Sequence, residues 1–438
     1  MRWIRAVGVG FTATLCVVAS GCFPPEPVPG NGRTERVSIA SDGTQANSLS
    51  VTSNISGDGR YVVFDSDASS LVPGDTNSAS DVFVRDRQTG TTTRVSVATD
   101  GSEGNAGSTR PKISADGRYV SFGSVASHLV AGDTNGVVDV FVHDLQTGTT
   151  TRVSVTSGGG QSNAFTFTES AISEDGRYVA FYSSATNLVA GDTNGVNDIF
   201  VHDRQTSTTT RESVKSDGTQ ANGGSSLPAI SGDGRYVVFE SVATNLVPGD
   251  LNGKQDIFIH DRQGGSTSRV NVPVSDFEAN GDAHFPTISR DGKVAAYFSE
   301  ATNIVAGDTN GASDVFVHEL TTGNRSRVSV ASDGTQGNGA SAVPSLSADG
   351  RYVAFNSQAT NLVTGDTNAA SDVFIRDRQT GTTTRDSLDG DEAQGNNSSS
   401  TPSISGDGRY FSFTSAASNL VAGDTNGVLD IFARDRFG

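Results

Sequence analysis

One repeat runs through almost the whole chain. An Asp-Gly pair recurs seven times, with its aspartates 58, 59, 58, 58, 58 and 58 residues apart. These aspartates are Asp58, Asp116, Asp175, Asp233, Asp291, Asp349 and Asp407. Such regularity is typical of repeat architectures, in which each unit buries its apolar faces against its neighbours. The 438-residue chain is therefore predicted to build one closed body instead of several unrelated domains.

Each repeat is predicted to form four short strands. In one copy a first strand begins at Pro111, and Asp116-Gly117 forms the tight turn to a second strand at 118–122. A long loop leads to a third strand at 139–142, and a Gln-Thr-Gly turn leads to a fourth at 151–155. The equivalents of the second strand at 236–239 and 352–355 are apolar on consecutive residues, so both faces of that strand must be covered.

Four antiparallel strands with covered faces, repeated seven times, predict an all-β, seven-bladed β-propeller. Residues 33–39 match the fourth strand of a repeat, whereas the chain stops at 430–434, a third strand. We therefore expect residues 34–40 to complete the last blade and to remove an open sheet edge.

The first 32 residues have the features of a targeting segment. Residues 1–21 contain Arg2 and Arg5, a short apolar run and small residues, which indicates a secretory signal peptide. The run 19–22, Ala-Ser-Gly-Cys, resembles the lipobox of bacterial lipoproteins, which implies cleavage before Cys22 and its acylation. Residues 22–32 form a proline-rich linker, and 33–438 form the propeller. We expect an exported protein that is lipid-anchored to the bacterial cell envelope.

Two runs within the repeat carry a family resemblance. The segments 55–64, ISGDGRYVVF, and 81–86, DVFVRD, resemble the PD40 or TolB-type WD40-like propeller repeat. The resemblance extends over residues 33–438 and implies the propeller fold without implying one function. The TolB propeller has six blades, whereas this chain contains seven repeats.

The formal net charge is −18. This excess of acidic residues disfavours nucleic acid as a partner, and it disfavours membrane contact other than through the lipid anchor. Both long loops of each repeat are predicted to lie on one face of the ring. We expect that face to be strongly negative, with Lys254 almost its only cation.

One acidic motif, Asp-x-Asn-x-x-x-Asp, recurs on the predicted long-loop face. Alternating oxygen ligands around a turn suit Ca²⁺, the one cofactor that the sequence suggests. Alternatively, each Asp and Asn bonds its own turn backbone. The copies are Asp75, Asn77 and Asp81; Asp133, Asn135 and Asp139; Asp192, Asn194 and Asp198; Asp250, Asn252 and Asp256; Asp308, Asn310 and Asp314; Asp366, Asn368 and Asp372; and Asp424, Asn426 and Asp430.

No catalytic residues are predicted. His143, His202, His260 and His318 share one repeat position with arginines of other copies, which suggests surface or turn residues. The sequence contains neither a Gly-x-Ser-x-Gly elbow nor a phosphate-binding loop. A propeller enzyme would instead need a non-repeated acid and base cluster along its channel.

The copies differ most in two blade-to-blade loops. Phe165, Phe167 and Glu169 lie in one, and Phe277 and Phe285 in or after another. These side chains form a candidate partner-binding patch, or they fill irregular gaps between blades. We expect a non-catalytic binding or scaffolding propeller whose partner is an envelope protein or polysaccharide. The alternatives are a Ca²⁺-dependent surface or adhesion protein and a propeller lyase or glycosidase.

Overall fold

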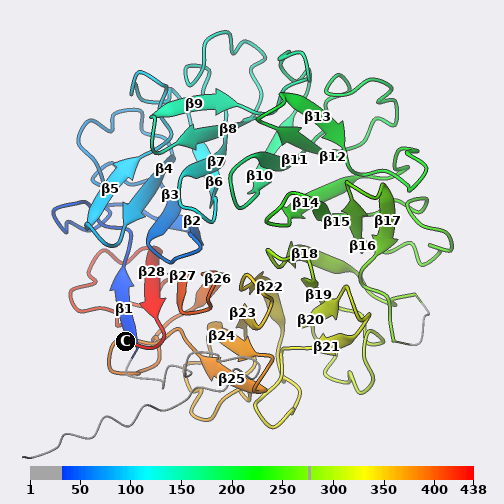
Figure 1. Cartoon of the computed structure of the whole chain (residues 1–438). Helices are drawn as coiled ribbons and strands as arrows, with labels where there is room; N and C mark the ends of the chain where they lie inside the picture. The colour runs from blue at the N-terminus through cyan, green and yellow to red at the C-terminus, as the bar shows by residue number, and fades with distance from the viewer. Residues whose placement is uncertain (1–31, 275–277) are drawn as a thin grey trace, which may run out of the picture.

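A computed structural model describes residues 32–274 and 278–438 of the chain. Within these residues, seven four-stranded antiparallel sheets surround a central channel like the blades of a fan (Figure 1). The predicted seven-bladed β-propeller is confirmed. The predictions for the signal peptide, Cys22 and most of the linker concern residues 1–31, which lie outside the described residues. The described part of the chain contains no helix long and apolar enough to cross a membrane.

In the first six blades the strands run outward from the channel in chain order, and in the last blade β1 (Arg33–Arg36) is the outermost strand. The first strands are β2 (Ser50–Ile55), β6 (Ser108–Ile113), β10 (Thr166–Ile172), β14 (Ser225–Ile230), β18 (Ala283–Ile288), β22 (Ser341–Leu346) and β26 (Ser399–Ile404). The second are β3 (Tyr61–Ser66), β7 (Tyr119–Ser124), β11 (Tyr178–Ser183), β15 (Tyr236–Ser241), β19 (Val294–Ser299), β23 (Tyr352–Ser357) and β27 (Tyr410–Ser415).

The outer half of each blade completes this order. The third strands are β4 (Asp81–Asp86), β8 (Asp139–Asp144), β12 (Asp198–Asp203), β16 (Asp256–Asp261), β20 (Asp314–Glu319), β24 (Asp372–Asp377) and β28 (Asp430–Asp435). The fourth are β1 (Arg33–Arg36), β5 (Thr91–Arg94), β9 (Thr149–Arg152), β13 (Thr208–Arg211), β17 (Ser266–Arg269), β21 (Arg325–Arg327) and β25 (Thr382–Arg385).

Several strand boundaries of the second blade differ from those expected. β7 covers Tyr119–Ser124 instead of 118–122, β8 extends to Asp144 instead of 142, and β9 begins at Thr149 instead of 151. The first strand of the second blade begins at Ser108, so Pro111 lies inside it and not at its start. The pairing with β7 shifts register between Thr109 and Lys112, so a β-bulge accommodates the proline, which has no N–H to donate. The fourth strand of that blade ends at Arg152, three residues earlier than predicted.

The core lies between adjacent blades. Val63 and Val84 of the first blade pack with Val120, Phe122 and Phe141 of the second, and all are buried. This arrangement explains why the second and third strands are apolar on consecutive residues, since each face contacts a different neighbour.

One aromatic residue in this core is chemically unlike its equivalents. Tyr297 is fully buried and stacks on Phe316, with ring centroids 5.9 Å apart. Its hydroxyl has no hydrogen-bond partner within the described residues, and the other blades carry phenylalanine at this position. We predict that Tyr297→Phe raises the free energy of unfolding by about 1 kcal/mol or more, because an unsatisfied buried hydroxyl is removed.

Chemical denaturation checks this prediction, with Tyr182→Phe as the matched control. The Tyr182 hydroxyl donates to Glu169 Oε2 over 3.1 Å, so its removal should not stabilise the fold. A Tyr297→Phe variant that is no more stable than the parent chain would contradict this prediction.

The chain ends meet in the last blade, as predicted. β1 pairs with β28 in antiparallel register from Arg33 opposite Asp435 to Arg36 opposite Phe432. Val37 then donates its N–H to the Ile431 carbonyl over 2.7 Å and is fully buried. The regular pairing covers 33–36 instead of the predicted 34–40, because Ile39 turns away to bridge Gln45. Figure 1 shows β1 beside β28, near the C-terminus.

A second closure lies at the channel. Directly after each first strand, a backbone N–H of one blade donates to a carbonyl of the next, over 2.9 to 3.4 Å. The seven links join Gly57 to Ala115, Asp116 to Glu174, Glu174 to Gly232, Gly232 to Arg290, Asp291 to Ala348, Ala348 to Gly406 and Gly406 to Gly57. This complete ring holds the blades together at the axis independently of β1.

Candidate functional site

The antiparallel topology sorts the loops onto two faces. The Asp-Gly and Gln-Thr-Gly turns lie on one face, which we call the turn face. The loops between second and third strands and the loops between blades lie on the other, which we call the long-loop face. The seven Asp-x-Asn-x-x-x-Asp motifs lie on the long-loop face, each reaching into the start of a third strand.

An arginine lies between the two aspartates of every motif. In the first blade, Arg94 Nη1 lies 3.5 Å from Asp75 Oδ1 and 3.2 Å from Asp81 Oδ2. The equivalent distances in all seven motifs fall between 3.0 and 3.9 Å. The arginines end the fourth strands: Arg36, Arg94, Arg152, Arg211, Arg269, Arg327 and Arg385. The guanidinium therefore occupies the place between the carboxylates that a metal ion would take.

The asparagine of each motif is committed to structural bonds. Asn77 Nδ2 donates to Asp81 Oδ2 over 3.1 Å, and Asn77 Oδ1 accepts the Ala79 N–H. All seven copies repeat both bonds. The amide thus presents donors to the carboxylate, whereas a cation would need its oxygen.

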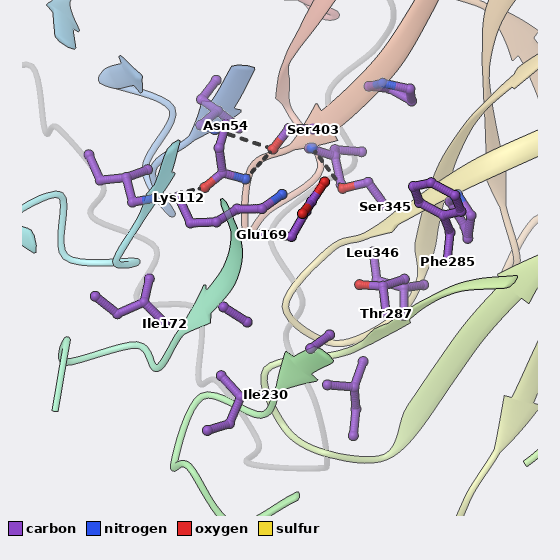
Figure 2. Close-up of a pocket in the computed structure, with 18 of the residues that line it drawn as sticks. Asn54, Lys112, Glu169, Ile172, Ile230, Phe285, Thr287, Ser345, Leu346 and Ser403 are labelled. Atoms are coloured by element: carbon purple, nitrogen blue, oxygen red, sulfur yellow. Dashed lines mark hydrogen bonds between the residues drawn. The ribbon is translucent and has the colours of Figure 1, made fainter. Parts of the chain in front are cut away.

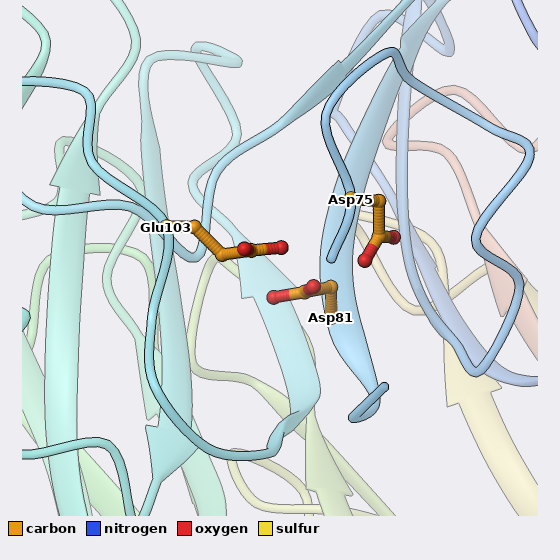
Figure 3. A group of neighbouring side chains, drawn as sticks. All are labelled: Asp75, Asp81 and Glu103. Carbon is orange, nitrogen blue, oxygen red and sulfur yellow. The ribbon is translucent and has the colours of Figure 1, made fainter. Parts of the chain in front are cut away.

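Two copies of the motif are more acidic than the rest. Glu103 and Glu278 join the first and fourth motifs at a position where the other copies have glutamine. Asp75, Asp81 and Glu103 each place an oxygen within 4.8 Å of the others (Figure 3). Burial and the neighbouring Asp81 raise the pKa of Asp75 to about 6. The folded state therefore holds this proton more tightly than the unfolded chain does. The free energy of unfolding decreases as pH rises from 3.8, the ordinary pKa of an aspartate, to about 6.

These contacts correct one expectation and bear on another. Lys254 is not almost the only cation of the long-loop face, because seven arginines neutralise part of its acidic charge. The asparagines bond their own turns as the alternative interpretation expected, but the aspartates bond arginines. No observation tests the expected Ca²⁺ binding. Because the arginines lie between the carboxylates, we now expect Ca²⁺ to bind only where such an arginine is removed, and Arg94→Met provides the test below.

The four repeated histidines are not surface or turn residues, contrary to the sequence-based interpretation. Each is at most 8% exposed. His143 Nδ1 lies 2.8 Å from Thr150 Oγ1 of the fourth strand, which covers this end of the third strand. Burial lowers the pKa of His143, and likewise of His202, His260 and His318. These imidazoles are structural.

The central channel holds a cavity of about 430 Å³, lined by all seven first strands (Figure 2). One repeat position near its long-loop mouth differs strongly among the blades: Thr52, Arg110, Glu169, Leu227, Phe285, Val343 and Thr401. Five of these residues precede a bulge proline, and all five have positive φ, between 47° and 57°. Strained backbone of this kind aims a side chain and marks candidate sites.

The third blade departs furthest from the repeat. Its first strand, β10, has seven residues where the others have six, which accounts for the single 59-residue spacing. The extra residue brings Thr168 against Gly123, where any Cβ would collide with Thr168. Glu169 then enters the channel mouth, 3.6 Å from Arg110 Nε, and accepts a hydrogen bond from the Tyr182 hydroxyl.

The predicted partner-binding residues differ in exposure and lie on different blades. Phe165 is 43% exposed and meets Phe167 edge-on, with ring centroids 5.0 Å apart. Phe167 is half-buried and stacks on Tyr182, 4.3 Å away, so it also fills a gap between blades. Phe285 is 44% exposed, two blades along the ring. Phe277 lies outside the described residues.

Sequence reasoning missed further groups at this mouth. Glu240 accepts hydrogen bonds from Ser226 Oγ and the Phe285 N–H. His284 Nδ1 lies 3.7 Å from Glu240 Oε2, and this carboxylate raises the pKa of His284. Val125 and Val242, 49% and 52% exposed, follow second strands on the long-loop face, and each donates its N–H to the residue before a first strand, Gly107 or Gly224. We call Val125, Phe165, Val242 and Phe285 the rim patch.

No protein-family model matches this chain, and no curated protein sequence matches it. Among solved structures, an oligogalacturonate lyase from Vibrio parahaemolyticus is similar at 14% identity and TM-score 0.53, over 92% of this chain and 96% of the lyase. The β-propeller domain of the trilobed protease from Pyrococcus furiosus is similar at 11% identity and TM-score 0.54, over 90% and 97%.

TolB from Acinetobacter baumannii matches at 18% identity and TM-score 0.41, over 69% of this chain. This chain spans 58% of the length of that protein. The likenesses to the lyase and to the trilobed protease domain show the β-propeller fold alone.

Proposed function

We propose that this chain is a non-catalytic binding propeller of the bacterial cell envelope. Acylated Cys22 would hold it to a membrane, and the linker would keep the propeller away from the lipid. Its partner, an envelope protein or polysaccharide, would bind at the long-loop mouth of the channel.

One observation carries this proposal. The rim patch places four exposed apolar side chains on four consecutive blades, the second to the fifth. The positions equivalent to Val125 and Val242 in the other blades are Asp67, Ser184, Glu300, Gln358 and Ala416. Exposed apolar side chains on consecutive blades, at positions that are mostly polar elsewhere in the ring, are typical of an interaction surface.

We predict that the double variant Phe165→Ala, Phe285→Ala captures about ten-fold less partner from envelope extract than the parent chain does. Exposed aromatic anchors dominate binding energy at such surfaces. Both side chains are more than 40% exposed, so the fold should tolerate the change. Leu251→Ala is the matched control, since Leu251 is 85% exposed on a loop outside the patch. Equal retention by the double variant, or equal loss in the control, would contradict the proposal.

A propeller lyase or glycosidase is the second candidate. It is favoured by the acid and base groups that gather at the channel mouth in only some blades: Glu169, Tyr182, Glu240 and His284. Turnover of oligogalacturonate that is lost in Glu169→Gln or Glu240→Gln would favour this candidate over a binding module.

A further inference from the structure

The channel contains one cation that stands out from the rest of the chain. The sequence has four lysines. Three of them pair with carboxylates, Lys215 with Asp217, Lys254 with Asp282 and Lys293 with Asp291, at 3.3, 3.9 and 3.1 Å. Lys112 has no carboxylate within 4 Å and no hydrogen-bond acceptor within the described residues, although it lines the cavity (Figure 2).

Lys112 also interrupts a structural pattern. At the same position in other blades, Asn54, Ser345 and Ser403 accept a backbone N–H from the next blade, over 2.9 to 3.2 Å. A lysine ammonium cannot accept a hydrogen bond, so this side chain extends into the channel instead. The strands around the cavity and nearby Arg110 lower the pKa of Lys112, whereas Glu169 raises it. Lys112 is an exposed residue of β6, so its ammonium is open to a ligand anion in the cavity.

The opposite wall of the cavity offers hydroxyl groups. Ser345 Oγ and Ser403 Oγ accept backbone N–H groups, and neither hydroxyl hydrogen has an acceptor within the described residues. Thr287 lines the same wall. These hydroxyls can donate to ligand oxygens across the cavity from Lys112. Because Glu169 offsets the charge of Arg110 at 3.6 Å, the site favours a ligand with few negative charges.

We propose that the channel binds a small hydroxylated carboxylate, with its carboxylate on Lys112 and Arg110 and its hydroxyls on Ser345, Ser403 and Thr287. A cavity of about 430 Å³ suits a ligand of this size. The proposal goes beyond docking at the rim patch and does not depend on it.

Pulsed acetylation of the intact propeller, read by mass spectrometry at each of its four lysines, tests the proposal. The probes are D-gluconate and D-sorbitol, which differ only in a carboxylate against a CH₂OH group. We expect gluconate to reduce labelling of Lys112 relative to Lys293, and sorbitol to leave the ratio unchanged. In a calorimetric titration, Lys112→Met should weaken gluconate binding about ten-fold or more, because a charge-assisted hydrogen bond is lost.

Lys293→Met is the matched control and should bind gluconate like the parent chain. Equal protection by gluconate and sorbitol would overturn the proposal, and so would no protection by either. Protection by inorganic phosphate without protection by gluconate would overturn the assignment to a carboxylate. Acetylation of the parent chain reports on Lys112 even if Lys112→Met fails to fold.

Discussion

Deletion of residues 33–40 is expected to lower the free energy of unfolding by about 5 kcal/mol or more. Val37 loses complete burial, and the strand pairing with β28 disappears. The fully buried Asp430 loses both Arg36, at 3.5 Å, and the Ser38 hydroxyl, at 2.5 Å. An uncompensated buried carboxylate is the largest of these costs. Thermal and chemical denaturation measure the change.

A peptide of residues 33–40 provides the control for this deletion. The peptide should restore the melting temperature of the shortened chain, whereas a scrambled peptide should not. The exposed edge of β28 should also make the shortened chain aggregate, which light scattering detects. The ring of backbone bonds around the channel remains, so we expect the other six blades to stay folded near the axis. An unchanged melting temperature would contradict the role of β1.

Arg94→Met is expected to destabilise the chain by about 3–5 kcal/mol, because the buried Asp81 is left without its cation. Methionine preserves most of the apolar stem, so the loss reports on the guanidinium. Addition of Ca²⁺ should restore part of the lost stability, since Asp75, Asp81 and Glu103 then form an empty acidic cluster. Ca²⁺ should leave the parent chain unchanged.

Arg118→Met serves as the matched control for Arg94→Met. Arg118 also pairs with a carboxylate, Asp144 at 2.7 Å, but its side chain is 37% exposed. Its loss should cost about 1 kcal/mol or less. Stabilisation of the parent chain by Ca²⁺ would show instead that the motifs bind the ion with their arginines in place.

The fold was predictable because the same pattern of strands and turns recurs in all seven repeats. Strand order, blade number and the pairing of β1 with β28 all follow from the period and from the two incomplete ends. Side-chain partners between strands were not predictable in the same way. His143 was expected at the surface or in a turn, yet the strand register places Thr150 directly opposite it. Arg94 ends a fourth strand and contacts Asp75 of the loop before the third strand, a partner that the sequence analysis did not predict. One available signal was overlooked: arginine stands at the same place in every fourth strand.

The candidate site was predictable only in part. Two blade-to-blade loops that differ from the other copies pointed to Phe165 and Phe285, but the bulges that aim Arg110 and Phe285 into the channel depend on backbone geometry. The 59-residue spacing was the signal for Glu169, since one extra residue in β10 shifts that side chain into the mouth. Gly123 was its partner signal, because only glycine leaves room for Thr168.

We propose above all that the residues common to all blades form the scaffold. The residues at the long-loop mouth, which differ from blade to blade, bind the partner. The most direct test places a photo-crosslinking amino acid at Phe165 in cells, and at Ser398 as the control. Ser398 is the exposed equivalent of Phe165 in the last blade. The account predicts a discrete crosslinked adduct from position 165 and none from position 398. Equal adducts from both positions, or an adduct from position 398 alone, would contradict it.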